Sequence, residues 1–265
     1  MLYNICCLYI IFFIFSCIGY FVEVAFCSLQ EKRIIWNRGF LLGPYIPIYG
    51  VGATLIVYFL SKYYNDPLAF FCLTVIMCST IEYLTSFFME KLFKVRWWDY
   101  SKERFNINGR VCLTNSILFG FGGMIVQYLI MPHIYQLIKI TPTLHLCVIA
   151  LICFIIFITD LIVTTNALFK VKSTLLTFKE LDVTELAKEE VIKSITKHEF
   201  SFDRIIKAFP KIGIINNKSV ADFRELVLKA KKILKENKQK RTDKRKRQKE
   251  ELLELIDKIK NKTQK

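Results

Sequence analysis

The chain has 265 residues, of which 53% are hydrophobic, and a formal net charge of +15. Residues 1–170 carry 12 Lys and Arg against 8 Asp and Glu, whereas residues 171–265 carry 26 against 15, so net charges of +4 and +11 result. This division excludes a single soluble domain. It predicts two parts of different character, a transmembrane domain over residues 1–170 and a basic helical cytoplasmic tail over residues 171–265.

Five apolar stretches follow one another along the first domain, at residues 4–27, 42–61, 68–90, 111–131 and 144–169. Each has or approaches the length of about 20 apolar residues that crosses a bilayer as a helix. The first stretch lacks the basic start of a signal peptide, because Met1 to Gly19 contains no charge. We therefore predict an all-α polytopic membrane protein with five transmembrane helices.

The basic residues of the loops alternate between sides. Before the first stretch and in the four following loops, Lys and Arg number 0, 3, 1, 6 and 1, and the tail is crowded with them. Because positive residues favour the cytoplasmic side, this pattern places the N-terminus outside and the C-terminus in the cytoplasm. We expect a multi-pass membrane protein that contacts lipid.

An internal repeat relates the second stretch to the fourth at one constant offset. The matched pairs are Gly39 with Gly109, Tyr49 with Phe119, Gly50 with Gly120, Gly52 with Gly122, and Ala53 with Gly123. One interpretation is a tandem duplication, two helices plus two helices with a fifth added, as transporters often show. The other is that small residues recur because helix packing in lipid favours them.

Proline and glycine interrupt the start of the second stretch, at Gly43, Pro44 and Pro47. Irregular backbone at membrane depth persists only inside protein or beside a wet cavity. The segment Asn37–Gly52 therefore either dips into the membrane before its helix begins, or is an interfacial loop that enters a helix near Pro47.

Charged residues within or at the ends of the apolar stretches are candidate functional residues, because they are costly in a bilayer. We expect them in one layer of the cytoplasmic third, where acids and arginines reduce each other's burial cost. They form either a substrate or ion pathway or a set of structural ion pairs. The residues are Glu23, Arg38, Glu82, Glu90, Arg110 and Asp160.

The third loop is a candidate docking site for a partner. Its aromatic residues are typical of the belt at a membrane interface. The belt does not account for its polar residues, and Asn-Gly beside arginines predicts a turn able to bind an anion or a partner. The docking residues are Arg96, Trp97, Trp98, Asp99, Tyr100, Asn106 and Asn108.

The tail contains 12 Lys or Arg within residues 229–249 and apolar positions at helical spacing on either side. This pattern predicts an interrupted helix that forms a coiled coil, contacts a partner or lies on anionic lipid, or else a solvated, partly disordered helix. Nucleic acid is not expected as a partner, because aromatic residues for base stacking are absent after Phe223.

Motifs for enzyme chemistry are absent from the sequence, which lacks a P-loop, H-E-x-x-H and G-x-S-x-G. Its nine cysteines lie in or beside apolar stretches without metal-ligand spacing, so neither a metal nor a cofactor is expected. We assign no catalytic residue and favour a protein that is not an enzyme.

Two long motif blocks resemble a known family. They are Asn37–Pro44 with Pro47–Gly50, and Trp98–Ser101 with Asn106–Arg110, accompanied by Glu82 and Glu90. Residues 1–170 resemble the putative ABC-transporter type IV permease family of bacteria. The resemblance implies a permease subunit of undefined substrate in the bacterial inner membrane, and the missing P-loop then requires a separate ATPase subunit.

Two other functions stay open. The chain is either a membrane-embedded enzyme that acts on a lipid phosphate, with arginines holding the phosphate and a carboxylate as base, or a non-transporting scaffold. Five helices are few for a pathway within one chain, so we also expect a homodimer or a partner subunit.

Overall fold

The computed structural model describes residues 2–32, 39–93, 95–180 and 213–214, together with Lys232 and Gln239. Its long helices are α1 (Leu2–Glu31), α3 (Pro67–Phe93) and α6 (Thr143–Glu180). Two further helical runs are composite. One comprises α2 (Pro47–Leu55), the π-helical η1 (Ile56–Leu60) and the 3₁₀ turn η2 (Ser61–Tyr63), and the other comprises α4 (Leu113–Met124), the π-helical η3 (Ile125–Ile130) and α5 (Met131–Ile140).

Contacts divide the chain into two compact units, of which the first comprises Met1–Ser173 and Phe200–Ile215. All the elements except the end of α6 belong to this unit. The boundary that the charge distribution suggests at residue 170 stays a prediction. The amphipathic tail and its coiled coil fall almost wholly outside the described residues, and nothing supports the coiled coil.

Four helices are long and apolar enough to cross a membrane within the part of the chain that the structure describes: Leu2–Leu29, Pro67–Phe93, Leu113–Ile140 and Thr143–Lys170. They coincide with four of the five predicted stretches, so the prediction of a helical, multi-pass membrane protein is confirmed at this level. The second stretch does not join them, because its helix begins only at Pro47. The count of five is therefore not confirmed.

Helix α2 begins where proline allows it. Pro47 occupies the first turn, where its missing N–H would have no helical partner in any case. The residues from Gly39 to Ile46 are not helical, and the N–H of Ile46 bonds to the carbonyl of Ser16 in the middle of α1 at 2.8 Å. Leu41 and Tyr45 are buried. Part of the irregular backbone is therefore held against protein, whereas Leu42 and Pro44 in the same segment are exposed.

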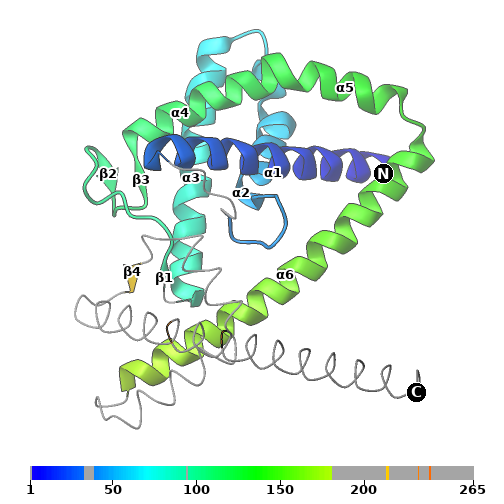
Figure 1. Cartoon of the computed structure of the whole chain (residues 1–265). Helices are drawn as coiled ribbons and strands as arrows, with labels where there is room; N and C mark the ends of the chain where they lie inside the picture. The colour runs from blue at the N-terminus through cyan, green and yellow to red at the C-terminus, as the bar shows by residue number, and fades with distance from the viewer. Residues whose placement is uncertain are drawn as a thin grey trace, which may run out of the picture. The chain divides into compact units, whose positions relative to one another are not determined.

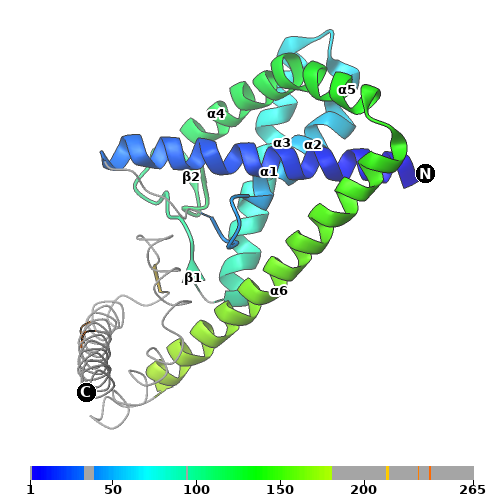
Figure 2. The same ribbon diagram turned by 45° about the vertical axis from the view of Figure 1, so that its right-hand side comes forward.

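Two helix pairs form the frame of the first unit, α1 with α2 and α3 with α4. Glycines allow both pairs to approach closely: a Cβ on Gly50 would clash with the Ser16 hydroxyl, and one on Gly120 would lie 2.5 Å from the Phe71 ring. In Figures 1 and 2, α4, η3 and α5 form one continuous run, with α1 beneath it in both views. One apolar cluster of buried residues joins α1, α2 and η1 to α5 and α6.

The structure strengthens the duplication hypothesis at three features related by the offset of the sequence repeat. Gly39 and its match Gly109 both have positive φ, at 116° and 66°. Gly50 and Gly120 each contact the preceding long helix. The π-helical turns η1 and η3 also coincide at this offset. Common packing of small residues would not by itself place a π turn at the same position twice.

Short strands organise the connection from α3 to α4. Strand β2 (Asn106–Ile107) pairs antiparallel with β3 (Val111–Cys112), and β1 (Val95–Arg96) pairs with β4 (Gly213–Ile214). Asn108 and Gly109 both have positive φ, and the N–H of Arg110 bonds to the carbonyl of Ile107 at 2.9 Å. These are the features of a type I′ turn, which Asn-Gly favours. The predicted turn is thus part of a hairpin.

Candidate functional site

The carboxylate of Asp160 in α6 fixes the irregular segment before α2. It accepts hydrogen bonds from the backbone N–H groups of Leu42 and Gly43 at 2.9 and 2.7 Å, and from the hydroxyls of Tyr45 and Thr164 at 2.7 and 2.9 Å. Only 9% of the residue is exposed. Among the described residues, hydrogen-bond donors rather than an arginine therefore satisfy this buried charge.

A second carboxylate, Glu82, has far fewer partners. It lies on α3 and is 5% exposed. Its Oε1 accepts a hydrogen bond from the Tyr100 hydroxyl at 3.1 Å, and Asn115 of α4 donates to that hydroxyl at 2.6 Å. Its Oε2 is buried without a hydrogen-bond partner among the described residues. Burial and the nearby Glu82 raise the pKa of Tyr100, which keeps the phenol protonated as a donor.

Glu23 of α1 lies beside this group. Its Oε2 accepts a hydrogen bond from the Tyr49 hydroxyl at 3.0 Å, and its Oε1 accepts a weaker one from the Cys27 thiol at 3.4 Å. Glu23 and Glu82 are near enough to repel each other electrostatically. The Tyr49 hydroxyl interacts electrostatically with both carboxylates and with Tyr100. We call Glu23, Tyr49, Glu82 and Tyr100 the glutamate–tyrosine cluster.

Arg110 pairs with Glu90 along one face of α3. The guanidinium lies 2.7 Å from the Glu90 carboxylate and 3.3 Å from the Ser86 hydroxyl. It also lies over the rings of Tyr83 and Phe87, at 5.8 and 5.5 Å from their centres. These four partners follow the helical spacing of one face. They occupy the guanidinium and limit its capacity to hold a phosphate.

Most polar side chains of the docking loop serve the loop itself. Asn106 donates to the carbonyl of Glu103 and accepts from the N–H of Gly109, at 2.8 and 2.9 Å. Asp99 accepts from the N–H and hydroxyl of Ser101. Asn108 donates to the Tyr83 hydroxyl at 2.9 Å, which ties the hairpin to α3. The loop is therefore pre-organised rather than a flexible linker.

The aromatic belt interpretation is wrong for Trp97. This residue is only 5% exposed and packs against Phe40 and Phe93, so it faces protein rather than lipid. Trp98 donates from Nε1 to the carbonyl of Arg110 at 2.9 Å and is half-buried. The exposed apolar residues of the loop are instead Phe105, at 79%, and Ile107, at 59%.

The predicted charged residues thus separate into three groups: Glu23 with Glu82, Glu90 with Arg110, and Asp160 with the segment before α2. A single layer in which acids and arginines meet is supported only by the pair Glu90–Arg110. Arg38 lies outside the described residues, and the structure describes only the backbone of Arg96.

Three tyrosines of the site escaped the sequence analysis: Tyr45, Tyr49 and, as a ligand of Glu82, Tyr100. A second constant offset points to the cluster. Glu23, Glu31 and Lys32 recur at this offset as Glu82, Glu90 and Lys91. The same offset relates the α1 and α3 contacts of the two helix-pair glycines, because Phe12 and Ser16 meet Gly50 where Phe71 and Val75 meet Gly120.

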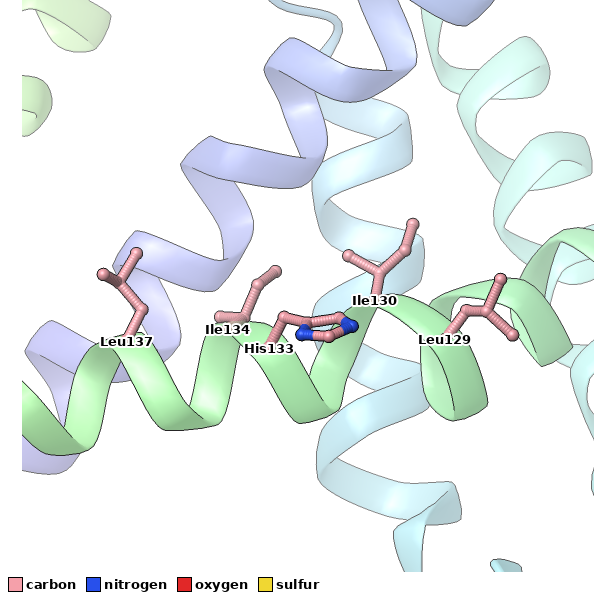
Figure 3. Close-up of a pocket in the computed structure, with 5 residues that line it drawn as sticks. All are labelled: Leu129, Ile130, His133, Ile134 and Leu137. Atoms are coloured by element: carbon pink, nitrogen blue, oxygen red, sulfur yellow. The ribbon is translucent and has the colours of Figure 1, made fainter.

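A pocket of about 420 Å³ lies apart from these groups, along η3 and α5 (Figure 3). Its lining is apolar except for one histidine: Leu129, Ile130, His133, Ile134 and Leu137. None of the predicted site residues lines it. Within the described ranges, no cluster of His, Cys, Asp and Glu is suited to hold a metal ion.

Four apolar helices long enough to cross a membrane, with the carboxylates of Glu82 and Asp160 buried among them, define a multi-pass membrane protein. The family model described as "Putative ABC-transporter type IV" matches residues 10–165, and the chain belongs to this family. The suspected resemblance is thereby confirmed, and the chain is a transporter-related membrane protein. Comparisons with curated proteins and with solved structures gave no match.

Proposed function

We propose that the chain is the permease subunit of an ABC-type transporter in the bacterial inner membrane, with its ATPase on a separate chain. The observation that carries this proposal is the glutamate–tyrosine cluster. The helix pair α1–α2 contributes Glu23 to it, and the pair α3–α4 contributes the equivalent Glu82. The chain also belongs to a family of transporter-related proteins. Repeats often place a transport site at their interface. Glu23 and Glu82 are therefore the pathway residues.

The β2–β3 hairpin is the proposed docking site for the ATPase. The positive-inside pattern favours a cytoplasmic position for it, and Asn106 and Asn108 hold it rigidly against α3. It exposes Phe105 and Ile107, and Phe105 has a positive φ of 52°, which is unusual for a bulky residue. An exposed aromatic side chain held in a strained conformation suits a binding anchor.

The test is purification from the native host in mild detergent, with identification of the proteins that accompany the chain. We expect an ABC-type ATPase in near-equal amount. The double variant Phe105→Asn and Ile107→Thr should lose it, because asparagine tolerates the backbone conformation but removes the apolar ring. The control Ile140→Thr, at an exposed apolar residue at the end of α5, should retain it.

The variant Glu82→Gln separates transport from assembly. It should leave the ATPase bound and abolish transporter function in cells that lack the native protein. A chain that purifies without an ATPase, under conditions that preserve an established complex, would contradict the permease proposal. The lipid-phosphate enzyme is less well supported, because Arg110 is already engaged by Glu90, Ser86 and two aromatic rings.

A further inference from the structure

The two buried acidic centres of the molecule differ in how their charge is satisfied. Asp160 accepts four hydrogen bonds, two of them from backbone N–H groups. Glu82 is at least as deeply buried, yet within the described residues it accepts one, from Tyr100, and its Oε2 accepts none. An ionised carboxylate with so few donors is costly in a low dielectric, whereas the neutral acid is not.

The described surroundings of Glu82 supply no positive charge. Over the described ranges of the chain, neither Glu82 nor Glu23 forms an ion pair with a lysine, arginine or histidine. The charged group that does interact with Glu82 there is the like charge of Glu23. Two neighbouring carboxylates with no counter-cation among the described residues are expected to share one proton, because both cannot be ionised cheaply.

The other titratable groups around the pair leave the proton to the glutamates. Among the described residues they are Cys27 from α1, Tyr49 from α2, Cys78 from α3, Tyr100 from the loop after β1 and, beyond it, Cys112 from β3. All are thiols or phenols, whose ordinary pKa values lie above neutrality. Asn115 from α4 is neutral and donates to Tyr100.

We infer that Glu23 and Glu82 form a proton-binding site that holds one proton between them at neutral pH. This inference deepens the proposed function and rests on it, since it names the proton as the ion that the pathway binds. The proton resides on the Glu82 carboxyl, whose Oε2 has no donor among the described residues. Glu23 is only partly buried and is the more accessible of the two carboxylates. A second proton makes the pair neutral, and loss of the first leaves two carboxylates.

The test is infrared spectroscopy of the full chain in lipid nanodiscs across a pH series, reading the carbonyl stretch of a protonated carboxylic acid. At neutral pH we expect such a band in the wild type and its loss in Glu82→Gln. The band should persist in Glu90→Gln, whose native carboxylate is ion-paired with Arg110. The inference is wrong if the neutral-pH spectrum of the wild type shows no such band. It is also wrong if a band is present but neither Glu82→Gln nor Glu23→Gln removes it.

A stability measurement gives a second readout. The folded chain holds a proton that unfolded glutamates, with a pKa of about 4.3, release. The folded state therefore binds more protons from about pH 4.3 up to the pH at which the folded pair loses its proton, so its stability should fall as the pH rises through this interval and level off above it. Glu82→Gln mimics the protonated acid, so its melting temperature should lose this dependence. Equal pH dependence in both proteins would contradict the inference.

Sodium titration distinguishes the proton from a metal cation. If sodium at fixed pH removed the carboxylic band, the site would be a metal-cation site and the inference would be wrong. Neither readout requires an ATPase. Loss of the ATPase with the band intact would therefore count against the proposed function alone, whereas a retained ATPase without the band would count against the proton site alone.

Discussion

At the scale of single residues, Asp160 supplies the hydrogen-bond acceptors that a helix would otherwise provide for the segment before Pro47, which is not helical. The N–H groups of Leu42 and Gly43 have no strand or helix to join, and in an apolar environment each would cost a substantial unmet hydrogen bond. One carboxylate satisfies both. The side chain of an acid in α6 thereby determines the backbone path of a segment that lies far earlier in the chain.

The substitution Asp160→Asn should therefore destabilise the protein. An asparagine presents one acceptor oxygen and one N–H₂ group, which faces donors rather than acceptors. Loss of two charge-assisted hydrogen bonds, at about 1.5 kcal/mol each, predicts a loss of about 3 kcal/mol. Thermal unfolding in detergent measures it. In the matched control Asp66→Asn, the exposed side chain bonds the N–H of Ala69, and asparagine serves equally well there. Similar losses in both variants would contradict the role of Asp160.

The acidic residues of this site could be predicted from the sequence, but their tyrosine partners could not. Charges stand out in apolar stretches, so Glu23, Glu82 and Asp160 could be selected before their contacts were known. Tyrosines do not stand out, because they are common in membrane helices at interfaces. Tyr45, Tyr49 and Tyr100 become ligands of the three acids only through contacts between segments distant in the sequence. Periodicity along one helix carries no information about such contacts.

At the scale of elements, glycine controls how closely helices pack. Gly50 faces α1, and a Cβ there would clash with the main-chain carbonyl of Phe12, which cannot rotate away. Gly122 is also helical but has no atom within 4 Å of the position of a Cβ. The two glycines therefore belong to the same repeat pattern but differ in what a methyl group would meet.

Alanine at these two glycines should have opposite effects on stability. Overpacking at Gly50 costs about 3 kcal/mol at the upper end of its usual range and exceeds the helical gain of about 1 kcal/mol, so Gly50→Ala should lose about 2 kcal/mol. Gly122→Ala should keep the helical gain and raise the melting temperature. Thermal unfolding of both variants in one detergent measures the difference. A stabilised Gly50→Ala would show that α1 and α2 do not pack at this glycine.

Local signals located the elements well but not their irregularities. Proline correctly indicated the start of α2, and Asn-Gly the turn at Asn108 and Gly109, because each acts through its own backbone preference. The π-helical turns η1 and η3 have no comparable signature. An inserted residue in a helix depends on the packing of its neighbours, and here the internal repeat was the only sequence signal.

At the scale of the whole molecule, the length of the helical run that contains α2 and the charge of the loops give opposite answers on whether α2 crosses the membrane. The helical run Pro47–Tyr63 reaches about 25 Å, below the roughly 30 Å of a hydrocarbon core. If it did not cross, α3 would be inverted, and the loop that contains Lys102, Arg104 and Arg110 would lie outside. The positive-inside rule opposes that arrangement. The segment before Pro47 can supply the missing length, because Asp160 satisfies the N–H groups of Leu42 and Gly43.

We therefore expect α2 to cross the membrane together with the segment before it. Reporter fusions test this: alkaline phosphatase is active only outside the cytoplasm, and green fluorescent protein fluoresces only within it. A fusion after Asn65, in the exposed turn between η2 and α3, should be active as phosphatase. Fusions after Lys102 and Lys170 should fluoresce. A fluorescent fusion after Asn65 with phosphatase activity after Lys102 would mean that α2 does not cross the membrane, as its short length suggests, and that the positive-inside rule fails for this loop. The hairpin would then lie outside, beyond the reach of a cytoplasmic ATPase.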